Sequence, residues 1–127
     1  MKASISNYRQ SPRKVRLVAS AIAGKSVPVA LTSLQFLDKR ASEVIEKLLA
    51  SAVANAKNTF QMDPKDLIVK ECRVDAGVTL HRIMPRARGS AAPIKKRSSH
   101  ILITLAVKPA PVEKKGKAAK KVTDAKK

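Results

Sequence analysis

The sequence has very few aromatic residues and a single cysteine. Phe, Trp and Tyr together make up 2% of its 127 residues, and Trp is absent. The chain therefore has no stacking platform for unpaired bases and lacks the aromatic anchors of an interfacial membrane helix. Cys72 has no partner for an internal disulfide, which is typical of a reducing compartment. We interpret it as a small buried strand residue rather than a catalytic thiol.

Long apolar runs and catalytic motifs are also missing. No stretch approaches the roughly 20 apolar residues that span a bilayer, so we expect no membrane partner. No Gly-rich phosphate loop or nucleophile–base pair stands out, and His81 and His100 have no further metal ligands nearby. The sequence therefore predicts a protein that is not an enzyme, with no catalytic residue, metal, cofactor or small-molecule substrate.

Positive charge is the dominant feature that is present. The 27 Lys and Arg outnumber the 9 Asp and Glu, which gives a formal charge of +18. Residues 1–27, 76–107 and 108–127 each carry +6, whereas residues 28–75 hold seven basic and seven acidic residues. A compact cation of this kind needs an anionic partner, for which nucleic acid is the first candidate and a membrane surface the second. The pattern indicates a neutral scaffold with three RNA-facing surfaces.

The periodicity of apolar residues predicts three helices. Ser11 and Pro12 fit the cap and first position of a helix that Gly24 ends. Pro28 opens a shorter second helix with its leucines (31, 34 and 37) facing inward, and Asp38 is expected to cap a third. Apolar residues hold the helical spacing from 41 to 56, which predicts a core-facing stripe. Residues 1–25 are basic and acid-free, as in a transit peptide, but their helical pattern favours a folded segment.

Three strands complete the prediction. Residues 3–9 read as a short strand, and residues 67–75 as a second, with Ile68, Cys72 and Val74 on one face. The alternation of Ile101, Ile103, Leu105 and Val107 predicts the last strand. The expected fold is a single α+β domain over 1–108, a small three-stranded sheet packed on helices. The lysine- and alanine-rich tail, 109–127, is predicted to be disordered.

A long basic hairpin is predicted over about residues 78–101. Gly89-Ser90 and Pro93 supply turn chemistry, and cations flank them on both sides: Arg82, Arg86 and Arg88 before, Lys95, Lys96 and Arg97 after. If both arms continue their strands, the hairpin projects on the order of 30 Å. A two-stranded ribbon of that length is marginal by itself in water, so we expect it to need a partner. An ordinary solvent-exposed loop is the alternative, which six cations without an acidic residue disfavour.

The start of the first predicted helix is a second candidate surface. Arg9, Arg13, Lys14 and Arg16 gather there, beside the free backbone N–H groups that a helix start offers to phosphate. A merely hydrated helix end is equally compatible with the sequence. The composition also fits a nucleoid-associated or histone-like DNA-binding protein, because such proteins carry similar lysine–alanine tails.

Three segments resemble the bacterial-type ribosomal protein L22 (uL22) family: SPRKVRLVASAIAGK (11–25), KLLASAVANAKN (47–58) and LHRIMPRARGSAAPIKKRSSHILITL (80–105). The similarity covers about residues 3–108. It implies a β-α-α-α-β-β domain with a long protruding hairpin, in the cytoplasm as part of the large ribosomal subunit. The partners it implies are 23S rRNA, protein L4, other large-subunit proteins and the nascent polypeptide. The family's globular part lies near the exit of the peptide tunnel, the hairpin tip lines the tunnel, and the family acts in early assembly.

The resemblance also implies site residues. The rRNA contacts would be Arg9, Ser11, Pro12, Arg13, Lys14, Arg16, Lys25, Arg82, Pro85, Arg86, Arg88, Lys95, Lys96, Arg97, Ser98 and His100. The exit-tunnel tip would be Arg88, Gly89, Ser90, Ala91, Ala92 and Pro93. The sequence departs from the family at Ser90, where arginine is frequent, and at His81, where lysine is common. The first departure leaves one cation fewer at the tip.

Overall fold

The computed structural model describes residues 1–108 and has the predicted β-α-α-α-β-β order. Its elements are β1 (Lys2–Tyr8), α1 (Pro12–Ile22), α2 (Val27–Gln35), α3 (Arg40–Phe60), β2 (Leu67–Pro85) and β3 (Ala91–Val107), with short 3-10 turns at Pro64–Asp66 and Ala87–Gly89. The predicted disordered tail, 109–127, lies outside the described residues. Within residues 1–108, no helix is both long and apolar enough to cross a membrane.

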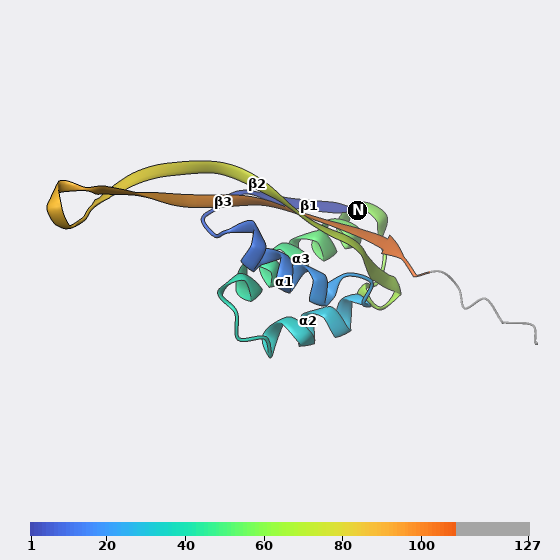
Figure 1. The fold of residues 1–127 in the computed structure, drawn as a ribbon. Coiled ribbons are helices and arrows are strands. Elements are labelled where there is room, and N and C mark those ends of the chain that lie inside the picture. Colours follow the sequence, from blue (N-terminus) through green and yellow to red (C-terminus); the bar gives the residue numbers. More distant parts are fainter. Residues whose placement is uncertain (109–127) are drawn as a thin grey trace, which may run out of the picture.

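The sheet is antiparallel, with β3 in the centre and the order β1-β3-β2. All three helices cover one of its faces (Figure 1). The link between α1 and α2 runs along the outer edge of β2, where the Gly24 N–H donates to the Val69 carbonyl at 2.8 Å and the Val69 N–H donates to the Lys25 carbonyl at 2.9 Å. The left-handed backbone of Gly24 (φ +78°) makes this bend possible, as expected for a glycine after a helix.

The helices begin close to the predicted positions, with two differences in their caps. Ser11 precedes α1 and Pro12 opens it as predicted, but the Ser11 side chain makes no capping hydrogen bond. The prediction that Asp38 caps α3 is wrong, because Lys39 occupies that position, also without a side-chain bond. Leu34 of α2 is buried, whereas Leu31 of α2 and Leu37, which follows the end of the helix, are half-buried against the core. Both α1 and α3 therefore begin with backbone N–H groups that no capping side chain satisfies.

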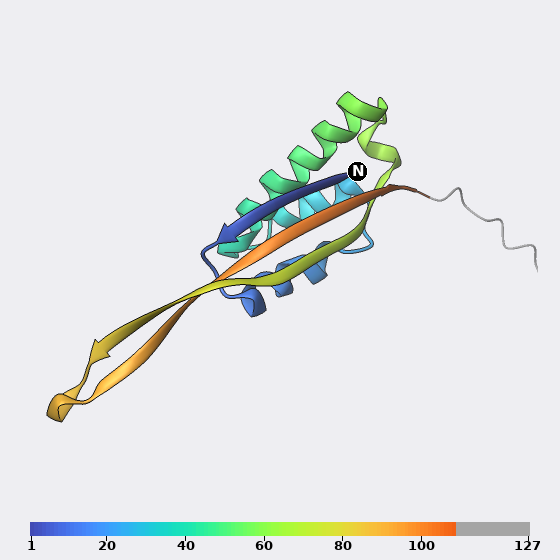
Figure 2. The same ribbon diagram turned by 90° about the horizontal axis from the view of Figure 1, so that it is seen from above.

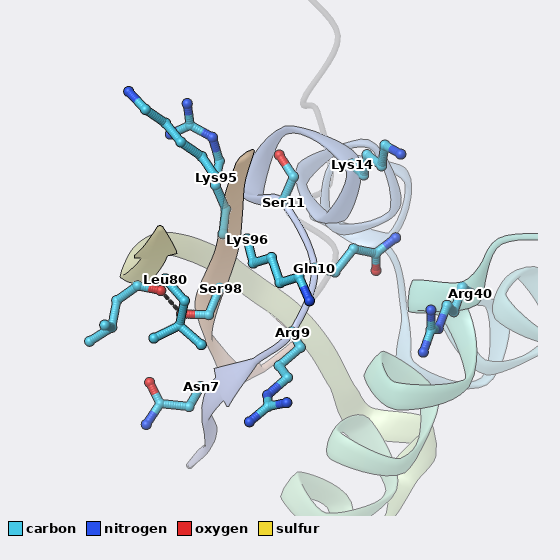
Figure 3. A pocket seen from close by; sticks show the side chains of 12 residues that line it. Asn7, Arg9, Gln10, Ser11, Lys14, Arg40, Leu80, Lys95, Lys96 and Ser98 are labelled. Atoms are coloured by element: carbon cyan, nitrogen blue, oxygen red, sulfur yellow. Dashed lines mark hydrogen bonds between the residues drawn. The ribbon is translucent and has the colours of Figure 1, made fainter. Parts of the chain in front are cut away.

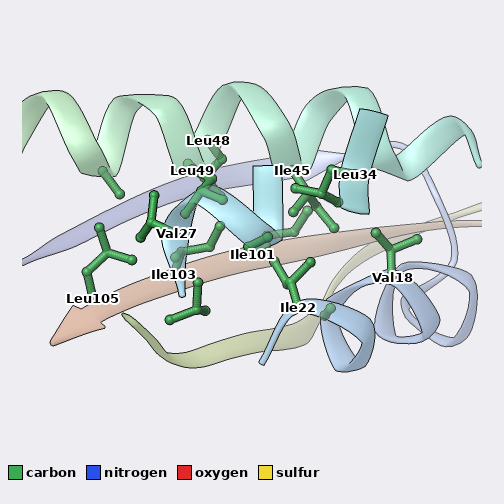
Figure 4. Packing of buried hydrophobic residues seen from close by; sticks show 14 of the residues in the cluster. Val18, Ile22, Val27, Leu34, Ile45, Leu48, Leu49, Ile101, Ile103 and Leu105 are labelled. Atoms are coloured by element: carbon green, nitrogen blue, oxygen red, sulfur yellow. The ribbon is translucent and has the colours of Figure 1, made fainter. Parts of the chain in front are cut away.

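The core lies between α3 and the sheet, with α1 and α2 closing its sides (Figure 4). The predicted stripe of α3 is confirmed: Ile45 and Leu49 are fully buried, and three buried alanines (41, 52 and 56) let the helix approach closely. Ile101 and Ile103 meet them from β3 and are at most 1% exposed. Burying each such side chain contributes about 1.5–3 kcal/mol, so this layer holds the domain together.

The predicted face of β2 needs one correction. Leu67 and Val69 are buried, together with Val74, whereas Ile68 is only half-buried. A shift in the pairing register between Val69 and Glu71 inserts an extra residue, which reverses the alternation. Ile68 and Val74 therefore do not share the core face. At the end of β3, Val107 is 50% exposed instead of inward, because the core ends before it.

The basic hairpin (residues 79–97) is the part of β2 and β3 that extends beyond β1 (Figure 2). Seven residue pairs, from Thr79 with Arg97 to Pro85 with Ala91, form a ladder of roughly 23 Å at 3.3 Å per residue. The turn occupies residues 86–90, and the Arg86 N–H donates to the Ser90 carbonyl at 2.8 Å. Of the predicted tip residues, Arg88, Gly89 and Ser90 belong to this turn, whereas Ala91, Ala92 and Pro93 are paired residues of β3.

Candidate nucleic-acid interface

A surface hollow of about 960 Å³ lies at the base of the basic hairpin (Figure 3). We call it the basal hollow. Three separate parts of the chain line it: the connection from β1 into α1, the first residue of α3, and the part of the hairpin nearest the core. Its cationic lining residues are Arg9, Lys14, Arg40, Lys95, Lys96 and Arg97. The fold thus joins two basic blocks that the sequence analysis treated as separate surfaces.

Local backbone geometry directs the first of these parts into the hollow. Asn7 has a left-handed backbone (φ +56°), and its N–H donates to His100 Nδ1 at 3.3 Å. The Gln10 N–H then donates to the Tyr8 carbonyl at 2.8 Å, which closes a tight turn around Arg9. The pairing of β1 with β3 also shifts register after Ile5. These features let the chain leave the sheet and present Arg9 beside the start of α1.

Arg40 is a lining residue that the sequence analysis missed. It lies in the segment of zero net charge, so the charge count did not draw attention to it. Its carbonyl accepts a hydrogen bond from Tyr8 Oη at 3.3 Å, which ties the start of α3 to the end of β1. One signal was available: Lys39-Arg40 places two cations at a helix N-terminus, where the helix dipole disfavours positive charge. Such a placement points to an external anion.

No acidic side chain lines the basal hollow. Within residues 1–108 there are two salt bridges, Lys47 with Glu43 at 2.7 Å and Arg73 with Asp75 at 2.9 Å, and neither involves a lining residue. The bond from Arg73 holds the pKa of Asp75 below its usual value, and the bond from Lys47 does the same for Glu43. Those two carboxylates are engaged elsewhere, and within residues 1–108 no cation of the hollow forms a salt bridge.

The basic hairpin continues this positive surface outward. Residues 80–91 are all exposed, including Ile83 at 74% and Met84 at 45%, so this arm has no core of its own. The register and the alternation of strand side chains put Arg82 and Lys96 on one face of the ribbon and Lys95 and Arg97 on the other. Cations on both faces are what a ribbon surrounded by polyanion requires. A ribbon lying flat on a single surface would need them on one.

A family model described as ribosomal protein L22p/L17e matches residues 3–106. The chain belongs to this ribosomal protein family. The large ribosomal subunit protein uL22 of Herpetosiphon aurantiacus is 52% identical over 102 residues, which are 80% of this chain and 90% of the relative. The proteins of the same name from Pediococcus pentosaceus and Ligilactobacillus salivarius are 48% and 50% identical over 107 residues, 84% of this chain and 91% and 93% of theirs. The expected resemblance is confirmed, and the chain is a structural, non-enzymatic protein.

Several predicted contact residues of this L22-family chain have roles inside the protein. Pro12 is buried within the folded protein. Arg16 donates from Nε and Nη2 to the Val74 carbonyl, at 3.1 and 2.9 Å. Ser98 lines the basal hollow, but its Oγ donates to the Val78 carbonyl at 2.6 Å. Lys25 Nζ lies 3.5 Å from Ser33 Oγ on α2, away from the hollow. Pro12, Arg16 and Ser98 therefore have structural roles within the folded protein.

The remaining predicted residues are distributed along two regions. Ser11 and Lys14 line the basal hollow, and Arg13 is exposed on the first turn of α1. Arg82, Pro85, Arg86 and Arg88 are exposed along the hairpin and its turn. His100 is half-buried at the base, where it faces Asn7. Within residues 1–108, no three His, Cys, Asp or Glu side chains lie close enough together to hold a metal ion.

The turn of the hairpin has its own supporting contacts. Ser90 Oγ donates to the Ala87 carbonyl at 2.9 Å, and Arg88 has a left-handed backbone (φ +57°) followed by Gly89 at φ +70°. Ser90 therefore closes the turn with a hydrogen bond. The tip keeps two arginines, Arg86 and Arg88, both exposed.

Proposed function

We propose that this chain is a structural constituent of the large ribosomal subunit that binds 23S rRNA through the RNA backbone and shape. The observation that carries the proposal is the basic hairpin, exposed on both faces, with cations on both. The family membership adds support, because its relatives are named as large-subunit proteins. The cytoplasmic location follows from the same assignment.

Electrostatic neutralisation provides the mechanism. Arginine presents a planar fork of donors to phosphate oxygens and lysine presents a mobile charge, so both bind a backbone without reading bases. Phosphates on both faces of the ribbon neutralise its repelling cations and release counterions, which makes binding strongly dependent on salt. The same contacts tie RNA segments on opposite sides of the hairpin to one protein. The scarcity of aromatics is consistent with recognition of folded RNA rather than unpaired bases.

The position of the protein within the large subunit is part of the same proposal and rests on the family resemblance. The globular part of the protein, without the hairpin, would lie on the outside of the subunit near the exit of the peptide tunnel. The hairpin would run inward, so that Arg88, Gly89 and Ser90 reach the tunnel wall near protein L4 and meet the nascent chain. By joining separate RNA segments, the protein would also support early assembly of the subunit.

Sedimentation tests this function directly. Tagged chain expressed in a bacterium should travel with the large subunit through a sucrose gradient at high salt. A variant with Arg82, Lys96 and Arg97 all changed to Gln should be released at lower salt, because three phosphate contacts are lost. A variant with Lys47, Lys57 and Lys65 changed to Gln has the same net charge and serves as the control. Recovery of the wild-type chain with chromosomal DNA instead would contradict the proposal.

A further inference from the structure

The domain side of the basal hollow differs from the hairpin in being fixed by the protein itself. Tyr8 Oη holds the start of α3, His100 accepts from the Asn7 N–H, and Ser98 Oγ fastens the hairpin base to the Val78 carbonyl. Each wall therefore has support within the folded domain, whereas residues 80–91 have none beyond their own ladder and turn. The backbone that carries Arg9 and Arg40 is therefore held in place before any ligand arrives.

Two helices begin at this hollow. Ser11, which precedes α1, and Arg40, the first residue of α3, both line it, and neither helix has a side-chain cap on its free N–H groups. Helix N-termini favour anions, and phosphate oxygens accept from their N–H groups. The helix ends add to the cationic residues that line this single concave volume, and no acidic residue is among its lining residues. Several phosphates close together are needed to neutralise such a site.

We propose that the basal hollow binds a sharply turned segment of RNA backbone, with Arg40 as a direct phosphate ligand. A turned strand brings successive phosphates into one hollow, whereas a straight duplex presents its phosphates along a convex ridge. The inference rests on the proposed function for the identity of the polyanion as RNA. It adds a site whose domain side is preformed, separate from the tip, and a residue outside the basic segments of the sequence.

The site also sets the direction of the hairpin. Lys95, Lys96 and Arg97 belong to the hairpin, whereas Arg9 and Arg40 belong to the domain, and all five line the same hollow. A backbone segment that contacts both groups at once bridges the joint between hairpin and domain. Binding at the basal hollow therefore orients the hairpin relative to the domain, in addition to anchoring the protein.

Arg40→Gln and Lys39→Gln form a matched pair for the test. They remove the same charge at adjacent positions, but Lys39 does not line the hollow. The Tyr8 bond uses the backbone carbonyl of Arg40, so either variant keeps it. With an RNA hairpin that contains a sharp backbone turn as the probe, Arg40→Gln should weaken binding by about tenfold and lower the salt slope by about 1, while Lys39→Gln changes affinity by less than about twofold. Equal losses in the two variants would overturn the proposal.

Titration of the full-length, isotope-labelled chain with pyrophosphate tests the hollow without RNA. The amide signals of Ser11, Arg13 and Arg40 should shift first, and those of residues 86–90 should remain in place. Shifts that concentrate on residues 86–90, or equal affinity for a straight RNA or DNA duplex, would contradict a preformed site for turned RNA. Failure of the wild-type chain to sediment with the large subunit would contradict the proposed function instead, and the pyrophosphate result is independent of that.

Discussion

Arg16 and Val74 connect α1 to β2 at the position where the sheet narrows into the hairpin. The guanidinium donates two hydrogen bonds to the Val74 carbonyl, at 3.1 Å from Nε and 2.9 Å from Nη2. Val74 itself is 5% exposed and belongs to the core. An arginine expected to contact RNA thus also secures the base from which the hairpin projects.

Replacing Arg16 should therefore reduce stability. We expect Arg16→Ala to lower the free energy of unfolding by about 1.5–3 kcal/mol, because a charged donor is lost and the partly buried Val74 carbonyl is left without it. Arg13→Ala, on the exposed side of the same helix, should change it by less than about 0.5 kcal/mol. Urea denaturation of the free proteins measures both. Equal free energies of unfolding for the wild type and Arg16→Ala would show that the Arg16 hydrogen bonds contribute nothing to stability.

Gly77 leaves no room for a side chain. A Cβ there would lie 2.6 Å from Ser98 Oγ and 3.0 Å from His100 Nε2. Gly77→Ala should displace Ser98 from the Val78 carbonyl and lower the free energy of unfolding by about 1–3 kcal/mol. In the double variant with Ser98→Ala, the closer of the two contacts is absent, so the loss should be smaller than the sum of the single losses. Strict additivity in denaturation experiments would contradict this coupling.

The reactivity of the Cys72 thiol, and the dependence of stability on its ionisation, test whether this residue is buried. Burial raises the pKa of the Cys72 thiol to about 11, with a smaller contribution from Glu71. The thiol should react slowly with iodoacetamide at pH 8 in the folded protein and much faster in urea. Because the unfolded thiol ionises near pH 9 and the folded one near 11, this group stabilises the fold below pH 9 and loses that contribution as the pH rises through 11.

A comparison with Cys72→Ala isolates this effect from the titration of lysines, which occurs in the same range. The difference in unfolding free energy between the wild type and Cys72→Ala should be constant below about pH 9 and shift against the wild type above it. A difference that stays constant up to pH 11 would mean that the thiol is not desolvated.

The domain and the hairpin should also differ in hydrogen exchange. In the free protein, amides of residues 82–99 should exchange fast, whereas those of residues 44–56 in α3 should be strongly protected, because the hairpin lacks a buried face. Addition of large-subunit rRNA should slow exchange in the hairpin. Equal protection of both segments in the free protein would refute the dependence of the hairpin on RNA.

Two isoleucines make the same contrast by mutation. Ile45 is fully buried and Ile83 is 74% exposed. Ile45→Ala should cost about 2–5 kcal/mol of stability because it leaves a cavity under α3, whereas Ile83→Ala should cost less than about 0.5 kcal/mol. Thermal unfolding of the free proteins measures the difference. A large loss for Ile83→Ala would indicate that the hairpin folds back on the protein.

Local patterns in the sequence were sufficient for much of the fold. The spacing of Ile45 and Leu49, the proline at the start of α1 and the alternation of Ile101 and Ile103 each depend on residues close in the chain, so each could be predicted. The cap of α3 could not be predicted in this way: Asp38 is a good capping residue, yet α3 starts after Lys39. The prediction that Ile68 lies on the core face was wrong, because the bulge after Val69 depends on the pairing with β3. Local alternation of apolar residues does not reveal that pairing.

The sequence by itself indicated the class of partner, since a charge of +18 with few aromatics favours a polyanion recognised through its backbone. It also determined the hairpin, because residues 80–97 hold turn chemistry between two basic arms. Only the tertiary structure decided that Arg9, Arg40 and Lys96 line one hollow, since contacts between distant segments follow from how the sheet and helices pack. Likewise, packing of α1 on β2 assigned Arg16 to the Val74 carbonyl, a bond between residues 58 positions apart in the chain.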